Sequence, residues 1–256
     1  MLTALVLGRI STLMLVMARL AGFVVTSPFP GAHVQSSTKV VLVLVLAWPV
    51  ALTADGGFGA PTLALVPLTL SELGAGIAMG LAFRFTLSSA DLVGTMAAQS
   101  IGLNAASMFD PATEAHDSAI SRTISLFALS FALAIGAHRV VIAAVLESFR
   151  VIPLGTVAPL SNVARSLIDL AAECFAAGLR MSLPVAGLAL VVQMALAMVS
   201  RAAPTLQLFS IGWPMLLLTG LATLRLSVGD LARGLAAELG ALPGRIELVW
   251  GSLAGG

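Results

Sequence analysis

Charged side chains inside long apolar stretches are the residues of this sequence best placed to do chemistry. A charge at the centre of a bilayer costs roughly 2.5 to 3.5 kcal/mol on insertion scales, so each is expected to face protein or water. Such residues either relay ions and protons or hold helices together. They are Arg19, Glu72, Arg84, Glu147, Asp169, Glu173 and Arg180.

One group of these residues follows a helical spacing. Glu72, Gly76, Gly80 and Arg84 succeed one another at intervals of four, which places them on one face of a helix. The two glycines let another backbone approach closely. Glu72 and Arg84 lie about 18 Å apart along such a helix and cannot pair with each other. The pattern favours a packing face with a partnered carboxylate; movement of ions or protons and docking to another subunit are the alternatives.

A second group is also spaced by four residues. Arg165 and Asp169 attract across one helical turn, whereas Asp169 and Glu173 repel. The spacing is typical of a solvated or subunit-facing stripe. It does not indicate a paired-carboxylate active site, because no nucleophile, base or metal ligand stands beside it in the sequence.

Catalytic and metal-binding motifs are missing from the sequence. Ser227-Val-Gly-Asp230 contains the Gly-Asp half of an intramembrane aspartyl site, but the second aspartate motif is absent. Neither a His-Glu-x-x-His zinc motif nor a phosphate-binding Gly-x-x-x-x-Gly-Lys loop occurs. The single Cys174 and three scattered histidines form no metal-ligand spacing. We therefore expect no enzyme, no cofactor, no metal and no internal disulfide.

The elements that position these residues belong to a membrane-class chain. Of 256 residues, 59% are hydrophobic and 10% are charged, and the mean hydropathy is +1.04; soluble domains carry about 25% charged residues. The basic residues are spread evenly and the net charge is +1, which excludes a nucleic-acid-binding track. Charge-free stretches long enough for membrane helices are 40–54, 92–109, 123–138, 181–200 and 202–224.

These stretches predict an all-α integral-membrane fold with about six hydrophobic helices, several of them long or broken. From Leu160 to Ser200 the only strong breaker is Pro184; a helix of about 40 residues is roughly 60 Å long, twice the hydrocarbon thickness. Part of it is expected to leave the bilayer or to lie against other protein. Leu231, Leu235 and Leu239 give the C-terminal segment an amphipathic pattern. No repeat appears, so residues 1–256 are predicted to form a single domain.

A polar interruption crosses the middle of the chain, from Gln99 to Pro111. Within it, the segment from Gly102 to Pro111 combines small residues with the apolar side chains Leu103, Met108 and Phe109 and ends in Asp110-Pro111. From the residues alone, the simplest interpretation is a loop that connects two helices and is capped by Asp110. Alternatively, the segment lines a cavity, since irregular backbone at membrane depth is tolerated only where it is buried in protein or lines a cavity.

Individually weak pieces stand in a specific order along the chain, from about Arg9 to Leu224. They are Arg19, Pro28, Lys39, the Glu72-Gly76-Gly80 stripe, Gly94, Gln99-Ser-Ile-Gly102-Leu103, Phe109-Asp110-Pro111, Gly136-Ala-His138, Ser148-Phe149, Pro153-Leu-Gly155, Pro184 and Arg201-Ala-Ala-Pro204 through Phe209-Ser-Ile-Gly212-Trp-Pro214. In this order and spacing they resemble the FliR family of flagellar type III secretion export-gate proteins, which is related to the injectisome SctT and SpaR proteins. Gln207 departs from the resemblance, since the family usually has Asn there.

The resemblance implies a subunit of a hetero-oligomeric helical export gate in the bacterial inner membrane, within the flagellar basal body. Residues 1–150 would be the FliP-like part and residues 151–256 the FliQ-like part. The implied partners are FliP-like and FliQ-like subunits, an FlhB-like switch protein, membrane lipid and unfolded flagellar proteins. The segment from Gly102 to Pro111 would plug the pore, and Glu72 to Arg84 would pack against a subunit.

Three alternatives are left open. The chain could serve an injectisome, although the Phe-x-x-Gly-x-Pro ending and the Gly-x-His segment favour the flagellar branch. It could be a small-molecule secondary transporter, whose broken helices and intramembrane charges would form a midplane site. It could also be an assembly scaffold without contact to a pore.

Overall fold

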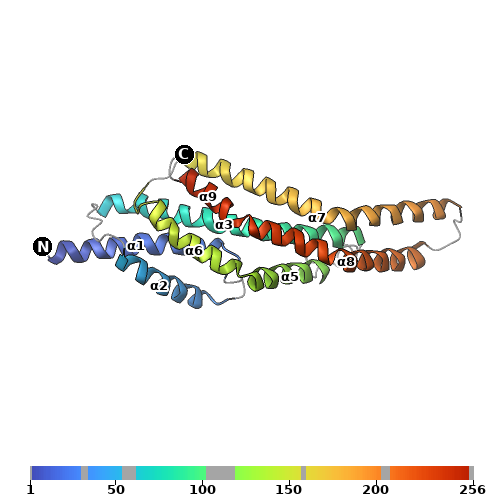
Figure 1. The fold of residues 1–256 in the computed structure, drawn as a ribbon, viewed down its shortest axis with the longest axis horizontal. Helices are drawn as coiled ribbons and strands as arrows, with labels where there is room; N and C mark the ends of the chain where they lie inside the picture. The colour runs from blue at the N-terminus through green and yellow to red at the C-terminus, as the bar shows by residue number, and fades with distance from the viewer. Residues whose placement is uncertain are drawn as a thin grey trace. The chain divides into compact units, whose positions relative to one another are not determined.

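Helices make up the secondary structure of this protein in the computed structural model, which describes residues 2–29, 34–53, 62–101, 119–156, 160–202 and 208–253 (Figure 1). Those ranges contain no strand, and the predicted all-α fold is confirmed. The helices are α1 (Leu2–Thr26), α2 (Ser36–Thr53), α3 (Thr62–Ile101), α5 (Ala119–Ile135), α6 (Ala137–Val151), α7 (Leu160–Ala202), α8 (Leu208–Gly240) and α9 (Leu242–Leu253).

Five helices of the described part are long and apolar enough to cross a membrane, or up to six if the bent pair α5 and α6 counts as one span. This agrees with the expected number of hydrophobic helices. The overlong helix is confirmed as well, because α7 runs for 43 residues and continues through Pro184.

The α5 and α6 pair is a broken helix. A single residue, Gly136, separates the two helices, and its φ is 84°. This left-handed backbone conformation favours glycine, which has no Cβ to clash with the following carbonyl. The Gly136-Ala-His138 segment thus ends one apolar helix and begins the next.

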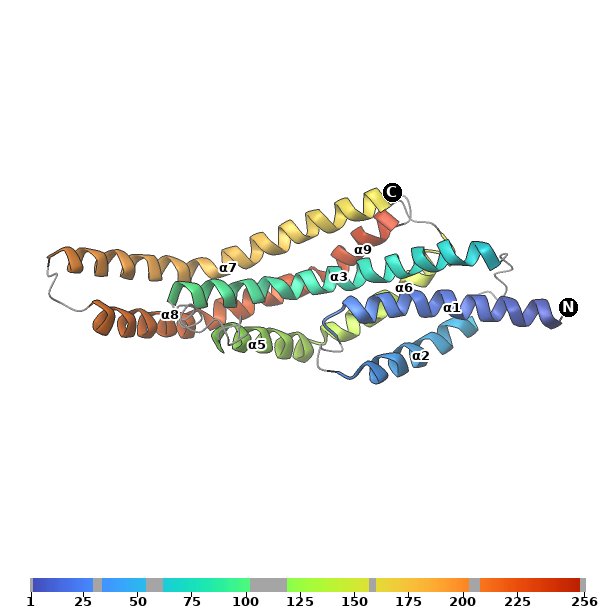
Figure 2. The same cartoon turned by 180° about the vertical axis from the view of Figure 1, so that it is seen from behind.

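The chain divides into two compact units. Unit 1 comprises residues 1–86, 136–172 and 240–256. In it, α1 packs along α2 and α6 packs along α9 (Figure 2). Side chains of α1 and α3 fill its centre, including the fully buried Leu15, Leu20, Met79 and Phe83.

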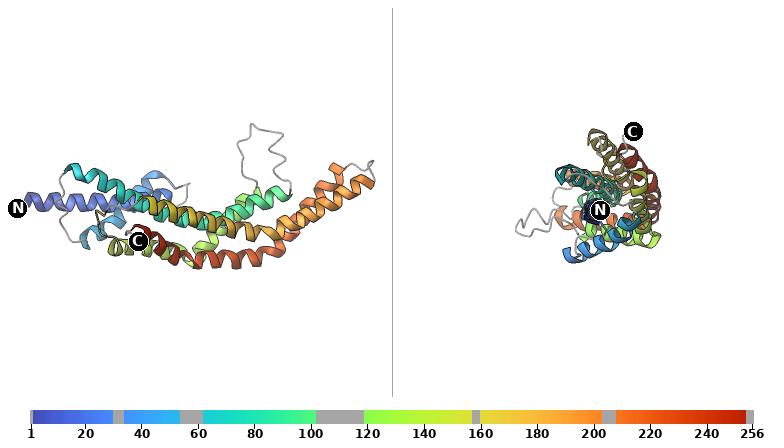
Figure 3. Two further views of the ribbon diagram at one scale, coloured as in Figure 1. Left: turned by 90° about the horizontal axis from the view of Figure 1, so that it is seen from above. Right: turned by 90° about the vertical axis from the view of Figure 1, so that its left-hand side faces the viewer.

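Unit 2 comprises residues 87–135 and 173–239. Its interior contains two small apolar clusters, one around Val93, Ile124 and Leu231 and one around Ala97, Ile101 and Val185. Within this unit, the second half of α7 and the first half of α8 lie side by side as an antiparallel hairpin (Figure 3).

Much of the apolar helix surface is uncovered within the chain. Only 11% of the membrane-span window of α2 and 17% of that of α7 is buried. Large apolar side chains such as Trp48 on α2 and Met198 on α7 are 65% and 70% exposed. These faces are suited to contact with lipid or with other proteins.

Candidate functional site

An ion pair in the interior of unit 1 joins α1 to α3. Nε of Arg19 lies 2.6 Å from Oε2 of Glu72, and each side chain is 1% exposed. Burial of a lone charge is strongly unfavourable, whereas a paired and hydrogen-bonded charge is tolerated. The two charges therefore require each other, and they fix which faces of α1 and α3 meet.

The rest of the Arg19 guanidinium caps the C-terminal end of α6. Its NH1 group donates to the carbonyl oxygen of Ser148 at 3.1 Å and to that of Ile152 at 3.2 Å, and NH2 also donates to Ile152. The last carbonyls of a helix lack partners within the helix and carry partial negative charge, so a cation there is favourable. The guanidinium also lies over the Phe149 ring, 4.6 Å from its centroid.

The second oxygen of Glu72 holds the segment that follows α6. Oε1 accepts a hydrogen bond of 2.8 Å from the backbone N–H of Gly155, and the neighbouring Ser71 hydroxyl donates to the carbonyl of Thr156. Both carboxylate oxygens of Glu72 are thus engaged. This geometry suits a structural ion pair, because each oxygen of Glu72 holds a different segment of unit 1.

Two members of the predicted stripe, Gly76 and Gly80, lie against α1 at the distance of backbone contact. A Cβ added at Gly76 would collide with the carbonyl of Arg19 and would lie 2.9 Å from the amide nitrogen of Phe23. One added at Gly80 would lie 2.8 Å from the carbonyl oxygen of Phe23. Such close approach of two helices requires glycine, as in other membrane-helix interfaces. The glycines therefore bring α1 and α3 close enough for Arg19 and Glu72 to meet.

Helix α1 contributes a matching glycine. A Cβ at Gly22 would collide with the carbonyl of Leu73 and would lie 3.0 Å from the amide nitrogen of Ile77 on α3. We name Arg19, Glu72 and their hydrogen-bond partners Ser148, Ile152 and Gly155 the Arg19 network. Arg19 and Glu72 stand out in the sequence as charges within apolar stretches, but their spacing does not identify them as partners, and no pattern marks Gly22.

The other predicted residues lie apart from this network. Arg84, the last member of the stripe, is exposed, as are Asp169, Glu173 and Arg180 on α7. Glu147 forms an exposed ion pair with Arg150. Gly102, Leu103, Met108, Phe109, Asp110 and Pro111 lie outside the described residues.

In the part of the chain that the structure describes, no group of three or more His, Cys, Asp or Glu side chains could hold a metal ion.

Comparison with known proteins adds an independent observation. Residues 10–241 match the family described as "Bacterial export proteins, family 1". The chain is 26% identical over 223 residues to the protein named "Flagellar biosynthetic protein FliR" of Caulobacter vibrioides, covering 85% of this chain and 88% of that protein. Proteins of the same name match at 28% identity in Escherichia coli, over 60% of this chain and 59% of the relative, and at 26% in Bacillus subtilis, over 79% and 80%.

Proposed function

We propose that this chain, which belongs to the FliR family within the bacterial export proteins of family 1, is a non-enzymatic subunit of the flagellar protein export gate. The observation that carries the proposal is the family match over residues 10–241. At the level of the family, the chain is a membrane-embedded component of flagellar export. The gate itself would lie in the bacterial inner membrane, within the flagellar basal body.

The exposed surface of α7 supports assembly with other subunits. Asp169, Glu173 and Arg180 are exposed on α7, a helix that also contains an apolar stretch long enough to cross a membrane. Charges facing hydrocarbon are costly, whereas a neighbouring protein can pair them or surround them with water. This favours a hetero-oligomer in which FliP-like and FliQ-like subunits cover α7, with the FlhB-like switch protein as a further partner.

The conduit for unfolded flagellar proteins would be closed by the segment from Gly102 to Pro111. The support for this step is the resemblance to the family and the composition of the segment. Met108 and Phe109 supply large apolar side chains, and methionine in particular repacks easily around irregular surfaces. Such side chains among small residues would form a deformable constriction that opens around a passing chain.

Co-purification tests the assembly. A tagged chain is expressed with and without its FliP-like and FliQ-like neighbours, purified in mild detergent and weighed by native mass spectrometry. We expect a stable mixed assembly of defined mass. A homo-oligomer that is indifferent to those neighbours would contradict the gate and would favour a secondary transporter.

Ion leakage tests the plug. Within a mixed assembly, shortening the segment from Gly102 to Pro111 is expected to raise leakage across the membrane. A shortening between Asp55 and Ala60, in the connection between α2 and α3, serves as the matched control and is expected to leave leakage unchanged. Unchanged leakage in both variants would favour a scaffold that does not contact the pore.

A further inference from the structure

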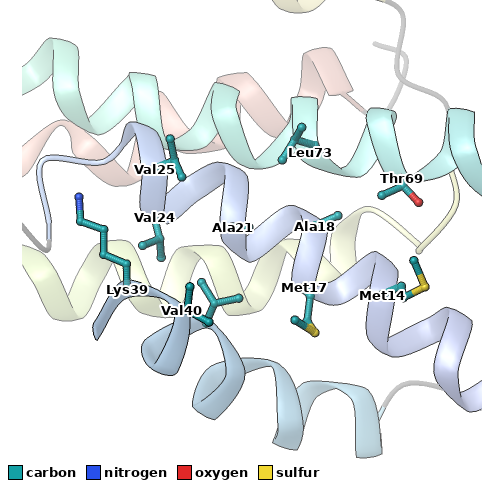
Figure 4. A pocket seen from close by; sticks show the side chains of 11 residues that line it. Met14, Met17, Ala18, Ala21, Val24, Val25, Lys39, Val40, Thr69 and Leu73 are labelled. Carbon is teal, nitrogen blue, oxygen red and sulfur yellow. The ribbon is translucent and has the colours of Figure 1, made fainter. Parts of the chain in front are cut away.

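An apolar groove on unit 1 has the features of a lipid site. Its volume is about 470 Å³, within the usual range for small-molecule sites. Side chains of α1, α2 and α3 line it, among them Met14, Met17, Ala21, Val43 and Leu73 (Figure 4). The lining is almost entirely carbon, and the hydroxyl of its Thr69 donates to the carbonyl of Leu65. The groove therefore offers an apolar ligand van der Waals contact rather than a pattern of hydrogen bonds.

One end of the groove carries a single positive charge. Lys39, the only lysine of the sequence, is the one charged side chain that lines it. It lies near Val24 and Val25, whereas Met14 lies at the opposite end (Figure 4). Among the described residues, Lys39 has no ion-pair partner. The groove thus combines an apolar length with an unpaired ammonium at one end.

The dimensions of the groove fit one leaflet of a bilayer. From Val25 to Met14, the wall formed by α1 rises about 16 Å, close to half of the roughly 30 Å hydrocarbon thickness. Lys39 lies in the first turn of α2, at one end of the candidate span Ser36–Thr53. A span of this length places its first turn near the headgroups, where lysine side chains reach towards phosphate.

We propose that this groove binds an acyl chain of an anionic glycerophospholipid, with the lipid phosphate held by the ammonium of Lys39. A helix of a partner protein matches the groove less well. It would leave Lys39 unpaired unless it supplied an acidic residue at that position, whereas an anionic lipid carries its charge at the level of the headgroups.

Lipid retention by the purified full-length chain tests the charged end. Native mass spectrometry compares bound phosphatidylglycerol with phosphatidylcholine of the same acyl chains. The wild type is expected to retain phosphatidylglycerol preferentially. Lys39→Gln is expected to lower that preference roughly five-fold, the effect of one basic side chain near an anionic surface, and Lys39→Arg is expected to preserve it. Arg139→Gln, which removes an exposed cation of α6 outside the groove, is the matched control.

A second variant tests the apolar length. Ala21→Phe fills the groove and is expected to lower retention of both lipids, whereas Ala143→Phe, at an exposed position of α6, is expected to leave retention unchanged. The proposal would be overturned if Ala21→Phe retained as much lipid as the wild type. It would also be overturned if Lys39→Gln kept the full preference for phosphatidylglycerol. Retention by the chain alone but not by a mixed assembly would also overturn it and would assign the groove to a partner protein. The lipid site does not rest on the proposed gate, so the two can fail separately.

Discussion

The two units stabilise their interiors in different ways. Unit 1 contains a buried ion pair, that of Arg19 and Glu72, and the hydrogen bonds of the network reach three helix segments. The described interior of unit 2 is built around small apolar clusters such as that of Val93, Ile124 and Leu231. Apolar packing tolerates small shifts, whereas a charged network has one satisfied arrangement. We therefore expect unit 1 to tolerate substitution of its interior less well than unit 2.

Removing one charge of the Arg19 network is expected to have the largest effect. Glu72→Ala leaves the guanidinium of Arg19 buried without its counter-charge, which typically lowers the free energy of unfolding by about 3 to 5 kcal/mol. Denaturant titration of the detergent-solubilised chain measures this. Glu147→Ala is the control, because its pair with Arg150 is exposed and is worth less than about 1 kcal/mol. Equal losses in the two variants would show that the network does not stabilise unit 1.

The double variant Arg19→Met with Glu72→Leu separates charge from packing. Replacing a buried pair by apolar residues of similar volume is often close to neutral, so most of the lost stability should return. If the double variant is as unstable as Glu72→Ala alone, the loss comes from disturbed packing or from the uncapped end of α6 instead.

Comparison of sequence and structure shows which parts of unit 1 are local properties. The spacing of Glu72, Gly76 and Gly80 predicts a shared helix face, because the helical period alone decides it. The partner of Glu72 is not local: Arg19 is 53 positions away, and any buried cation could have served. The contribution of Ile152 has no sequence signature at all, since it acts through its backbone carbonyl.

The helices likewise combine features that the local sequence determines with features that it does not. The length of α7 follows from the spacing of breakers, because a long apolar stretch in a membrane must satisfy its backbone within a helix. Helices α1 and α3 do not follow from charge-free stretches, because they contain charged residues such as Arg19 and Glu72. The break at Gly136 coincides with the Gly-Ala-His segment noted in the sequence. The left-handed backbone at this break, with a φ of 84°, is one that glycine adopts readily, so it is a local property.

A methyl group added to the stripe should have an intermediate effect. Gly76→Ala places a Cβ against the backbone of α1, which cannot move aside without separating the helices. We expect a loss of about 1 to 3 kcal/mol in the free energy of unfolding, typical of overpacking. Gly74→Ala, two positions earlier, meets nothing within 4 Å and should instead add up to about 1 kcal/mol through helix propensity. Changes of the same sign in the two variants would refute the close contact between α1 and α3.

The corresponding substitution in unit 2, Gly220→Ala, should have the smallest effect. A Cβ at Gly220 on α8 would collide with Cγ1 of Ile101 and would lie 2.7 Å from its Cδ1, so it meets a side chain rather than backbone. The Ile101 side chain has to change rotamer to make room, which backbone cannot do, and the gain in helix propensity offsets part of the cost. We expect a net loss of about 1 kcal/mol, smaller than that of Gly76→Ala.

Gly229→Ala serves as the control on the same helix, because its Cβ would meet nothing within 4 Å. It should raise the free energy of unfolding, so the difference between the two variants isolates the contact with Ile101. A loss at Gly220 as large as that at Gly76 would mean that unit 2 is packed as rigidly as unit 1. The contrast between charged and apolar interiors would then not govern how each unit responds to substitution.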